Sequence, residues 1–284
     1  TSIAVACNEA QVDPASDTKD IFREDENGDR RKKADNTERL WTITMNGCTG
    51  HLIAPEYMMT AAHCSPRQGA NYTSGAAMNE GRRGDITVTQ VVENNRGLDY
   101  AILKIRWNGA RPKNQKFPPL VATKASDVNT SASANQGDGI FTVGFPGDKT
   151  NSWGATYAEG RAKQVSGNLL RYNIGIINGN SGGGVWRKSD KMLVSLTNGG
   201  PKILGQAGWN GNDKNNARKW NHGAAMWNVY AASRTLQDIF PNGRNRFAAE
   251  GEGEGGSEEP LYVALGGETN AAADTHWVLV SVPQ

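Results

Sequence analysis

The glycine-rich segment 178–184, with the sequence NGNSGGG, restricts the possible folds of this chain more than any other segment. It directly follows the apolar run 174–177, so we expect a tight turn after a strand. Glycine adopts positive φ angles and lets other groups approach closely. Such a turn can expose the hydroxyl of Ser181 while backbone N–H groups converge on one point, as acyl-transfer chemistry requires. The alternative is an ordinary surface turn, because serine and glycine favour turns in general.

A nucleophilic serine also needs partners, because its hydroxyl reacts only when an adjacent base takes its proton. The chain has four histidines: His51, His63, His222 and His276. Of these, His63 ends an apolar run and directly precedes Cys64, while Asp99 opens the β-prone segment 100–105. An aspartate there can fix the tautomer of an imidazole and stabilise its charged form. A core histidine, a strand-initiating aspartate and a turn serine are the structural alternatives, but their joint occurrence in this order favours a catalytic triad.

Three segments resemble the signature blocks of the chymotrypsin-like serine proteases: TAAHC at 60–64, DYAIL at 99–103 and GNSGG at 179–183. The resemblance covers most of residues 41–228. It implies an all-β fold of two antiparallel six-stranded β-barrels with a C-terminal helix, and a serine endopeptidase without metal or cofactor. The expected nucleophile is Ser181, the expected base is His63, and Asp99 is expected to orient that base. The N–H groups of Gly179 and Ser181 are the expected oxyanion hole.

Two alternatives to a chymotrypsin-like enzyme follow from the same residues. The pattern Gly-x-Ser-x-Gly also matches the nucleophile elbow of α/β-hydrolases, whose triad runs in the order Ser, acid, His. His222 and His276 lie downstream of Ser181 and permit that order, but the His63 and Asp99 blocks would then be coincidences. The other alternative is a catalytically silent binding or structural protein with a protease fold. Such proteins usually lose a triad member, and here all three are present.

Within the family, the chain most resembles the glutamyl endopeptidases. The resemblance rests on Tyr172, on Asn180, and on the block 223–228 followed by a helix. In trypsin-like zymogens, a freed N-terminal amine pairs with an aspartate at the position of Asn180. Asparagine offers no such charge, so we expect activation that does not depend on an ion pair there.

The expected substrate-binding residues are Ile176, Thr197, Gly199 and Gly200. Glutamyl endopeptidases place a threonine where Ile176 stands and a histidine where Thr197 stands, and both contact the substrate carboxylate. Burying a carboxylate without donors or a counter-charge costs several kcal/mol. We therefore expect a preference for small or medium apolar side chains. The alternative is that His222 or the N-terminal segment restores specificity for acidic residues.

Three cysteines are present: Cys7, Cys48 and Cys64. The segment 45–53 resembles the family strand whose cysteine is bonded to the one after the catalytic histidine, which implies a Cys48–Cys64 disulfide. Two reduced cysteines are the alternative. A disulfide indicates an oxidising compartment, so we expect a secreted or periplasmic protein. Cys7 is then left without an assigned partner.

The pattern of polar and apolar segments predicts four regions. A polar N-terminal extension is expected over 1–40, the first β-barrel over 41–125, the second β-barrel with the C-terminal helix over 126–240, and an acidic linker with a short β tail over 241–284. Expected elements of the second barrel include strands over 161–165, 169–177 and 221–228 and a helix over 229–240. The fragment DENGD at 25–29 matches part of a calcium loop but lacks the other EF-hand ligands, so we expect a turn.

Charge and hydropathy limit the possible partners. The formal net charge of +2 is too small to indicate nucleic acid binding. No run of about eighteen apolar residues predicts a transmembrane helix. The residues from Thr1 onward do not resemble a signal peptide, so if the protein is secreted we expect that segment to have been removed. We expect a polypeptide substrate, no nucleic acid, no membrane and a monomer.

Overall fold

The computed structural model describes residues 31–36, 38–112, 115–133, 135–147, 154–200 and 220–248. All of them belong to the first of two units into which the chain divides, Thr1–Glu252; the second unit is Gly253–Gln284. The predictions for Cys7, for the turn at 25–29 and for the acidic linker and β tail after residue 248 lie outside the described residues.

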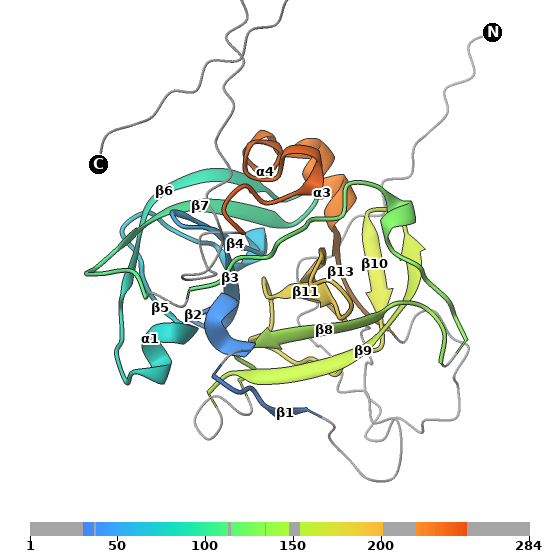
Figure 1. Ribbon diagram of the computed structural model, residues 1–284, viewed down its shortest axis with the longest axis horizontal. Coiled ribbons are helices and arrows are strands. Elements are labelled where there is room, and N and C mark those ends of the chain that lie inside the picture. Colours follow the sequence, from blue (N-terminus) through green and yellow to red (C-terminus); the bar gives the residue numbers. More distant parts are fainter. Residues whose placement is uncertain are drawn as a thin grey trace, which may run out of the picture. The chain divides into compact units, whose positions relative to one another are not determined.

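The first β-barrel is built from strands separated by short turns, as the alternating apolar pattern predicts (Figure 1). Its strands close in the order β2-β3-β4-β7-β6-β5 and are antiparallel throughout. They are β2 (Thr42–Met45), β3 (Cys48–Ala54), β4 (Tyr57–Thr60), β5 (Asn71–Ser74), β6 (Ile86–Asn95) and β7 (Tyr100–Trp107). Three short helices accompany them: η1 (Glu38–Trp41), η2 (Ala62–Cys64) and α1 (Gly75–Asn79).

The second β-barrel follows the η3 turn (Ala125–Asp127). Its strands are β8 (Gly139–Gly144), β9 (Thr156–Ser166), β10 (Leu169–Tyr172), β11 (Gly184–Arg187), β12 (Leu193–Gly199) and β13 (Asn221–Ala225). The order is β9-β10-β13-β12-β11-β8, and an antiparallel pairing between β8 and β9 closes the ring. The short strand β1 (Lys32–Lys33) pairs with Thr156 and Tyr157 at the start of β9, which β10 does not reach. The all-β fold class with two six-stranded barrels is therefore confirmed.

The chain leaves the second barrel through helices α3 (Met226–Ala232), α4 (Arg234–Ile239) and η5 (Pro241–Gly243). The prediction of one continuous helix over 229–240 is wrong in detail, and so is a last strand reaching 228. Ser233 adopts an extended conformation (φ −108°, ψ 113°), and its hydroxyl accepts a hydrogen bond from Leu236 N at 3.0 Å. A serine in this role caps the start of a new helix, so it divides the predicted helix in two.

Strand β10 is shorter than the predicted strand over 169–177, and β9 is longer than the predicted 161–165. The register between β9 and β10 shifts at Arg171 and Tyr172. Beyond that point the Asn173 side chain accepts a hydrogen bond from Arg161 N at 2.6 Å, in place of a backbone ladder bond. Residues 173–183 are thereby released from the sheet as a loop.

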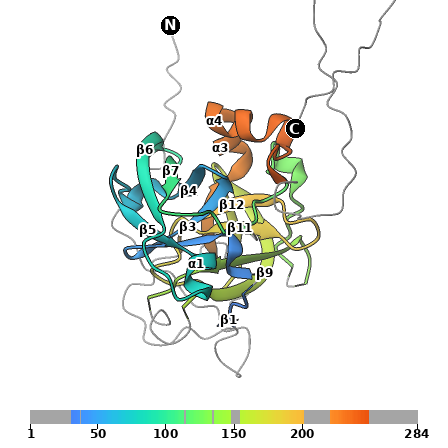
Figure 2. The ribbon, with the colours of Figure 1, turned by 60° about the vertical axis from the view of Figure 1, so that its left-hand side comes forward.

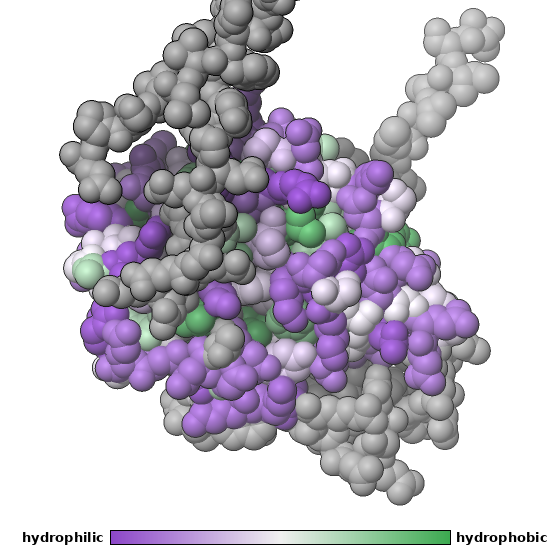
Figure 3. Space-filling model, in the orientation of Figure 1, coloured by the Kyte–Doolittle hydropathy of each residue, from purple (hydrophilic) through white to green (hydrophobic). Residues whose placement is uncertain are grey.

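Two apolar cores follow from the alternation of side chains along the strands. In β7, Leu103 points into the core of the first barrel. Its neighbour Ile102 points the other way, into the larger core, which also includes side chains from the second barrel and from α4. On the face in Figure 3, hydrophilic side chains cover most of the described surface and apolar ones form small patches. Within the described residues, no helix is long and apolar enough to cross a membrane.

Glu93 of β6 ties the first barrel to the start of α4, which lies beside the β6–β7 ribbon in both views (Figures 1 and 2). Its carboxylate accepts hydrogen bonds from Thr235 N at 3.1 Å and from the Tyr100 hydroxyl at 3.0 Å. Burial alone would raise the pKa of this carboxyl, but the hydrogen bonds from Thr235, Ser233 and Tyr100 outweigh it, so the pKa lies below its usual value.

We predict that Glu93→Gln lowers the free energy of unfolding by about 1–2 kcal/mol at pH 7, since hydrogen bonds to a charged group are lost. A carboxyl with a lowered folded-state pKa stabilises the protein above its unfolded pKa and loses that effect as the pH falls through the folded pKa. The deficit should therefore shrink below about pH 4. Urea unfolding at pH 7 and pH 3.5 measures it. The control is Glu56→Gln, whose carboxylate is 64% exposed; an equal Glu93→Gln deficit at both pH values would contradict the prediction.

Candidate active site

The serine turn predicted from the sequence joins the loop after β10 to β11. Gly179 and Gly182 have φ angles of 98° and 81°. A Cβ atom on Gly179 would lie 2.4 Å from Phe145 O, and one on Gly182 would lie 2.1 Å from Thr60 Oγ1. Both positions therefore require glycine for conformation and for space. Ser181 lies between them and is 2% exposed.

His63 and Asp99 are brought together from two different turns of the first barrel. His63 lies in η2 after β4, and Asp99 precedes β7 with a φ of 54°. The His63 Nδ1–H donates to Asp99 Oδ2 at 2.7 Å, and the His63 backbone N–H donates to Asp99 Oδ1 at 2.9 Å. Both carboxylate oxygens thus hold the same residue. Asn198 of β12 adds a contact from the second barrel, since its Nδ2 donates to Asp99 O at 3.4 Å.

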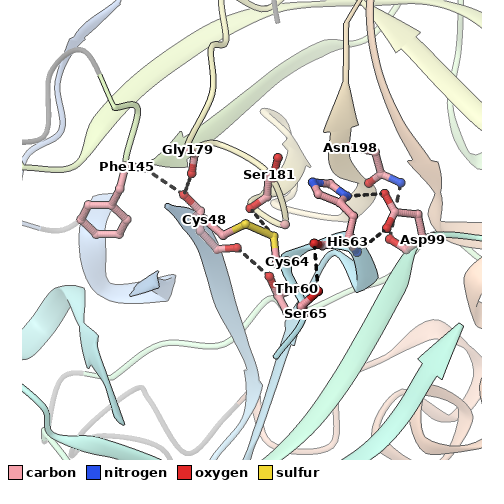
Figure 4. Close-up of a disulfide and its surroundings, with 12 residues drawn as sticks. Cys48, Thr60, His63, Cys64, Ser65, Asp99, Phe145, Gly179, Ser181 and Asn198 are labelled. Atoms are coloured by element: carbon pink, nitrogen blue, oxygen red, sulfur yellow. Dashed lines mark hydrogen bonds and ion pairs between the residues drawn. A yellow bond between two sulfur atoms is a disulfide. The ribbon is translucent and has the colours of Figure 1, made fainter. Parts of the chain in front are cut away.

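Ser181 lies beside the His63 ring, on the side opposite to Asp99 (Figure 4). Because Nδ1 donates to the carboxylate, Nε2 carries the lone pair of the neutral ring. A neutral imidazole held in this tautomer presents a base toward the serine. The structure thus places the three predicted residues in the order Ser181, His63, Asp99, although they come from loops far apart in the sequence.

A disulfide joins Cys48 at the start of β3 to Cys64 directly after His63, as the resemblance implied. It fixes η2, and hence His63, to a strand of the barrel wall. The Cys64 Sγ also lies 3.7 Å from Ser181 O, so the bridge packs against the backbone of the serine turn. One ring nitrogen of His63 and the two sulfur atoms lie within 4.8 Å of one another. Because the sulfurs are bonded to each other, they are not thiolate ligands for a metal.

The direction of the Gly179 and Ser181 N–H groups follows from the hydrogen bonds that the carbonyls of the same two peptide groups accept. Asn178 O accepts from Gly147 N at 2.8 Å, and Asn180 O accepts from Gly183 N at 3.0 Å. In a planar trans peptide the N–H points opposite to the C=O. The N–H groups of Gly179 and Ser181 therefore point away from these two acceptors.

Of the predicted substrate-binding residues, Ile176 and Thr197 are both fully buried. Thr197 Oγ1 accepts a 3.4 Å hydrogen bond from the hydroxyl of Tyr172, which is buried behind it. Gly199 ends β12, and Gly200 follows it. Residues 201–219 lie outside the part of the chain that the structure describes.

His222 lies against Gly199. The sequence analysis named His222 only in the alternative in which specificity for acidic residues is restored. The two residues pair across β12 and β13, and His222 Nε2 is 3.0 Å from the position of a Cβ on Gly199. Arg171 of β10 pairs with His222 from the other side. Sequence analysis missed Arg171, because only the register between β10 and β13 reveals its position.

Comparisons with known proteins place this geometry among peptidases. A family model described as a trypsin-like peptidase domain matches residues 48–195, just over half of the 284 residues. A glutamyl endopeptidase of Staphylococcus epidermidis is 24% identical over 144 residues, which cover 50% of this chain and 48% of the relative. A glutamyl endopeptidase of Staphylococcus aureus strain MRSA252 is 23% identical over 144 residues, covering 50% of this chain and 38% of the relative. The chain thus matches less than half the length of these curated relatives.

Two solved structures share the fold. The structure of a Glu endopeptidase in complex with MPD aligns with a TM-score of 0.50 and 21% identity, covering 72% of this chain and 97% of that one. Neuropsin, a serine protease expressed in the limbic system of mouse brain, aligns with a TM-score of 0.52 and 16% identity, covering 74% of this chain and 99% of that one. At these identities the likeness concerns the fold.

A second histidine, His51, lies fully buried behind the serine turn. Its Nδ1–H donates to Gly182 O at 3.2 Å, and its ring meets Trp186 edge-on with 5.7 Å between ring centroids. Burial lowers the pKa of His51 to about 4, and the hydrogen bond to Gly182 offsets only part of this effect. His51 is therefore neutral at pH 7 and supports the turn from behind.

We predict that His51 makes the protein sensitive to acid. The unfolded histidine binds a proton below about pH 6.5, whereas the folded one resists protonation down to about pH 4. Its contribution to the free energy of unfolding should therefore fall by about 1.4 kcal/mol per pH unit across that window as the pH is lowered. His51→Asn retains an N–H donor toward Gly182 but cannot titrate, so its stability should fall less steeply. Urea unfolding from pH 8 to pH 4 compares the two, and parallel curves would refute the prediction.

Proposed function

This chain belongs to the trypsin-like peptidase domain family, and on that premise we propose that it is a serine endopeptidase that cleaves polypeptides through an acyl-enzyme on Ser181. The observation that carries this proposal is the pair of hydrogen bonds that Asp99 accepts from His63, one from the ring Nδ1 at 2.7 Å and one from the backbone N–H at 2.9 Å. The bond to Nδ1 fixes the ring tautomer in which Nε2, on the side of Ser181, carries no hydrogen.

In the proposed mechanism, Ser181 Oγ attacks the carbonyl carbon of the scissile peptide bond while His63 Nε2 takes the hydroxyl proton. Asp99 stabilises the resulting imidazolium. The N–H groups of Gly179 and Ser181 hold the negative oxygen of the tetrahedral intermediate. His63 then gives its proton to the leaving amine, the C–N bond breaks, and the acyl group remains on Ser181. His63 then takes a proton from water, whose oxygen attacks the ester carbon. The bond between Ser181 Oγ and the acyl carbon breaks, His63 returns the proton to Ser181 Oγ, and the acid product leaves.

We also propose an extracytoplasmic location, either secreted or periplasmic, because structural disulfides such as Cys48–Cys64 are typical of oxidising compartments and rare in the cytosol. A disulfide closing a loop of 16 residues adds roughly 3 kcal/mol in the chain-entropy model. The monomeric state expected from the sequence remains part of this proposal.

Active-site labelling tests the proposed activity. A fluorophosphonate probe should label the folded wild-type chain at Ser181. Ser181→Ala should not be labelled, whereas Ser133→Ala, at an exposed loop serine, should react like the wild type. Asp99→Asn should lower kcat by up to about 10⁴-fold, because the imidazole loses its tautomer control. A folded wild-type chain that neither reacts nor hydrolyses peptides or esters would favour the catalytically silent alternative.

We propose a preference for small or medium apolar side chains before the cleaved bond. Ile176 offers no side-chain donor, and Thr197 offers a single hydroxyl, which accepts a hydrogen bond from Tyr172 and has one hydrogen left to donate. A substrate carboxylate would therefore be poorly compensated there. The position of His222 against Gly199 is the one observation that favours the acid-specific alternative.

Profiling cleavage over a peptide library separates these two specificities. We expect cutting after small or medium apolar residues, with His222→Gln changing the profile little. Dominant cutting after Glu would contradict the apolar preference. If that cutting were then lost in His222→Gln but retained in His51→Asn, recognition of the acid would be assigned to His222.

A further inference from the structure

Thr49 is a fully buried residue of the first barrel that contacts the serine turn of the second. Its N–H donates to Ser181 O at 2.8 Å. Its hydroxyl donates to Gly179 O at 2.8 Å and accepts from Phe145 N at 2.9 Å. One hydroxyl thus connects the end of β8 to the residue that is expected to supply half of the oxyanion hole.

The conformation of Gly179 depends on hydrogen bonds from other residues, because a glycine backbone is not restricted by a side chain of its own. Its φ of 98° and the 2.4 Å distance from Phe145 O to a Cβ position exclude any larger residue. Glycine, however, reaches many conformations at similar energy, so the direction of its N–H depends on what holds the two peptides around it. The preceding peptide is held by the bond from Gly147 N to Asn178 O at 2.8 Å.

The following peptide is held by Thr49. Among the described residues, the Thr49 hydroxyl is the only hydrogen-bond donor to Gly179 O. The bond from Phe145 N orients this hydroxyl, because an oxygen that accepts from Phe145 directs its single hydrogen elsewhere. Only a hydroxyl can accept from one backbone group and donate to the next at this point.

We propose that Thr49 is a positioning residue for the oxyanion hole. Its hydroxyl relays a hydrogen bond from Phe145 N–H to Gly179 C=O and so holds the Gly179 N–H in the orientation that receives the negative oxygen. This inference rests on the proposed peptidase function and adds a residue that does not touch the substrate. It acts on the transition state, because the oxyanion forms only there.

The test compares Thr49→Val with Thr49→Ser. Valine has nearly the shape of threonine but neither donates nor accepts, whereas serine keeps the hydroxyl. In Thr49→Val, kcat on a small peptide substrate should fall about 10- to 100-fold, less than the 10²–10³-fold seen when an oxyanion donor itself is removed. KM should change less than about twofold, since ground-state binding is untouched. Thr49→Ser should recover kcat to within about threefold of the wild type.

A transition-state analogue gives a readout that a purely structural role would not change. The inhibition constant of a peptidyl trifluoromethyl ketone should rise in Thr49→Val in parallel with the loss of kcat/KM, because its adduct places an oxyanion in the hole. Binding of the corresponding cleaved peptide should stay within about twofold of the wild type.

Thr142→Val is the matched control. Thr142 is also a buried threonine whose hydroxyl donates to a glycine carbonyl, that of Gly184 at 2.7 Å, but this carbonyl lies beyond the oxyanion turn. Loss of the Thr142 hydroxyl in Thr142→Val should lower the unfolding temperature about as much as Thr49→Val does, while kcat stays within about threefold of the wild type. If Thr49→Val does not fold, Thr49→Ala at low temperature must show the same split between kcat and KM.

Three results would overturn the inference. These are a kcat in folded Thr49→Val within about threefold of the wild type, an equal loss of kcat in Thr142→Val, or a loss confined to KM. In each case the wild-type chain still reacts with the fluorophosphonate probe, so the proposed function stands. A wild-type chain that is inert to probe and substrate would overturn both the proposed function and the role of Thr49.

Discussion

The contact between β3 and the serine turn is the interaction on which the rest of the site depends. Thr49 binds the carbonyls of Gly179 and Ser181, and His51, two residues further along the same face of the strand, binds that of Gly182. Cys48 is the first residue of the same strand, and its disulfide joins the strand to Cys64, which directly follows His63. One strand of the first barrel thus supports both His63 and the serine turn. Because the site is divided between two barrels, its geometry is only as precise as this contact.

Neutral hydrogen bonds, rather than ion pairs, hold the serine turn. Asn180 is 3% exposed, and both its N–H and its side-chain Nδ2 donate to Ile177 O at 3.1 Å. The side-chain amide of Asn180 thus donates a hydrogen bond within the turn itself. An aspartate at this buried position would require a counter-charge. Burial likewise keeps His51 neutral. The turn is organised without any charge of its own, which supports the expectation that no ion pair at Asn180 is needed for activation; that expectation stays a prediction.

Two of the departures from the predicted elements share one physical cause, the competition of side chains with the backbone for hydrogen bonds. Asn173 replaces a ladder bond and ends β10 early, while Ser233 caps α4 and divides the predicted helix. Apolar periodicity continues through both points, so pattern analysis extends the elements across them. The early end of β10 has a functional consequence, because it releases the loop that carries Ile176 and leads to Ser181.

The sequence by itself determined the three residues proposed as the triad, because glycine spacing, an apolar run ending in His-Cys and an acid before a strand are local patterns. It determined the double-barrel fold only through the resemblance of these segments to a known family. Only the tertiary structure decided what surrounds them. Thr49 looks like any strand residue until β3 packs beneath Gly179, and His222 and Arg171 are joined only by strand register. The Thr49–Gly179 contact joins residues of different barrels that are 130 positions apart, and the Arg171–His222 contact depends on the register of two strands in the second barrel. No short-range pattern records either contact.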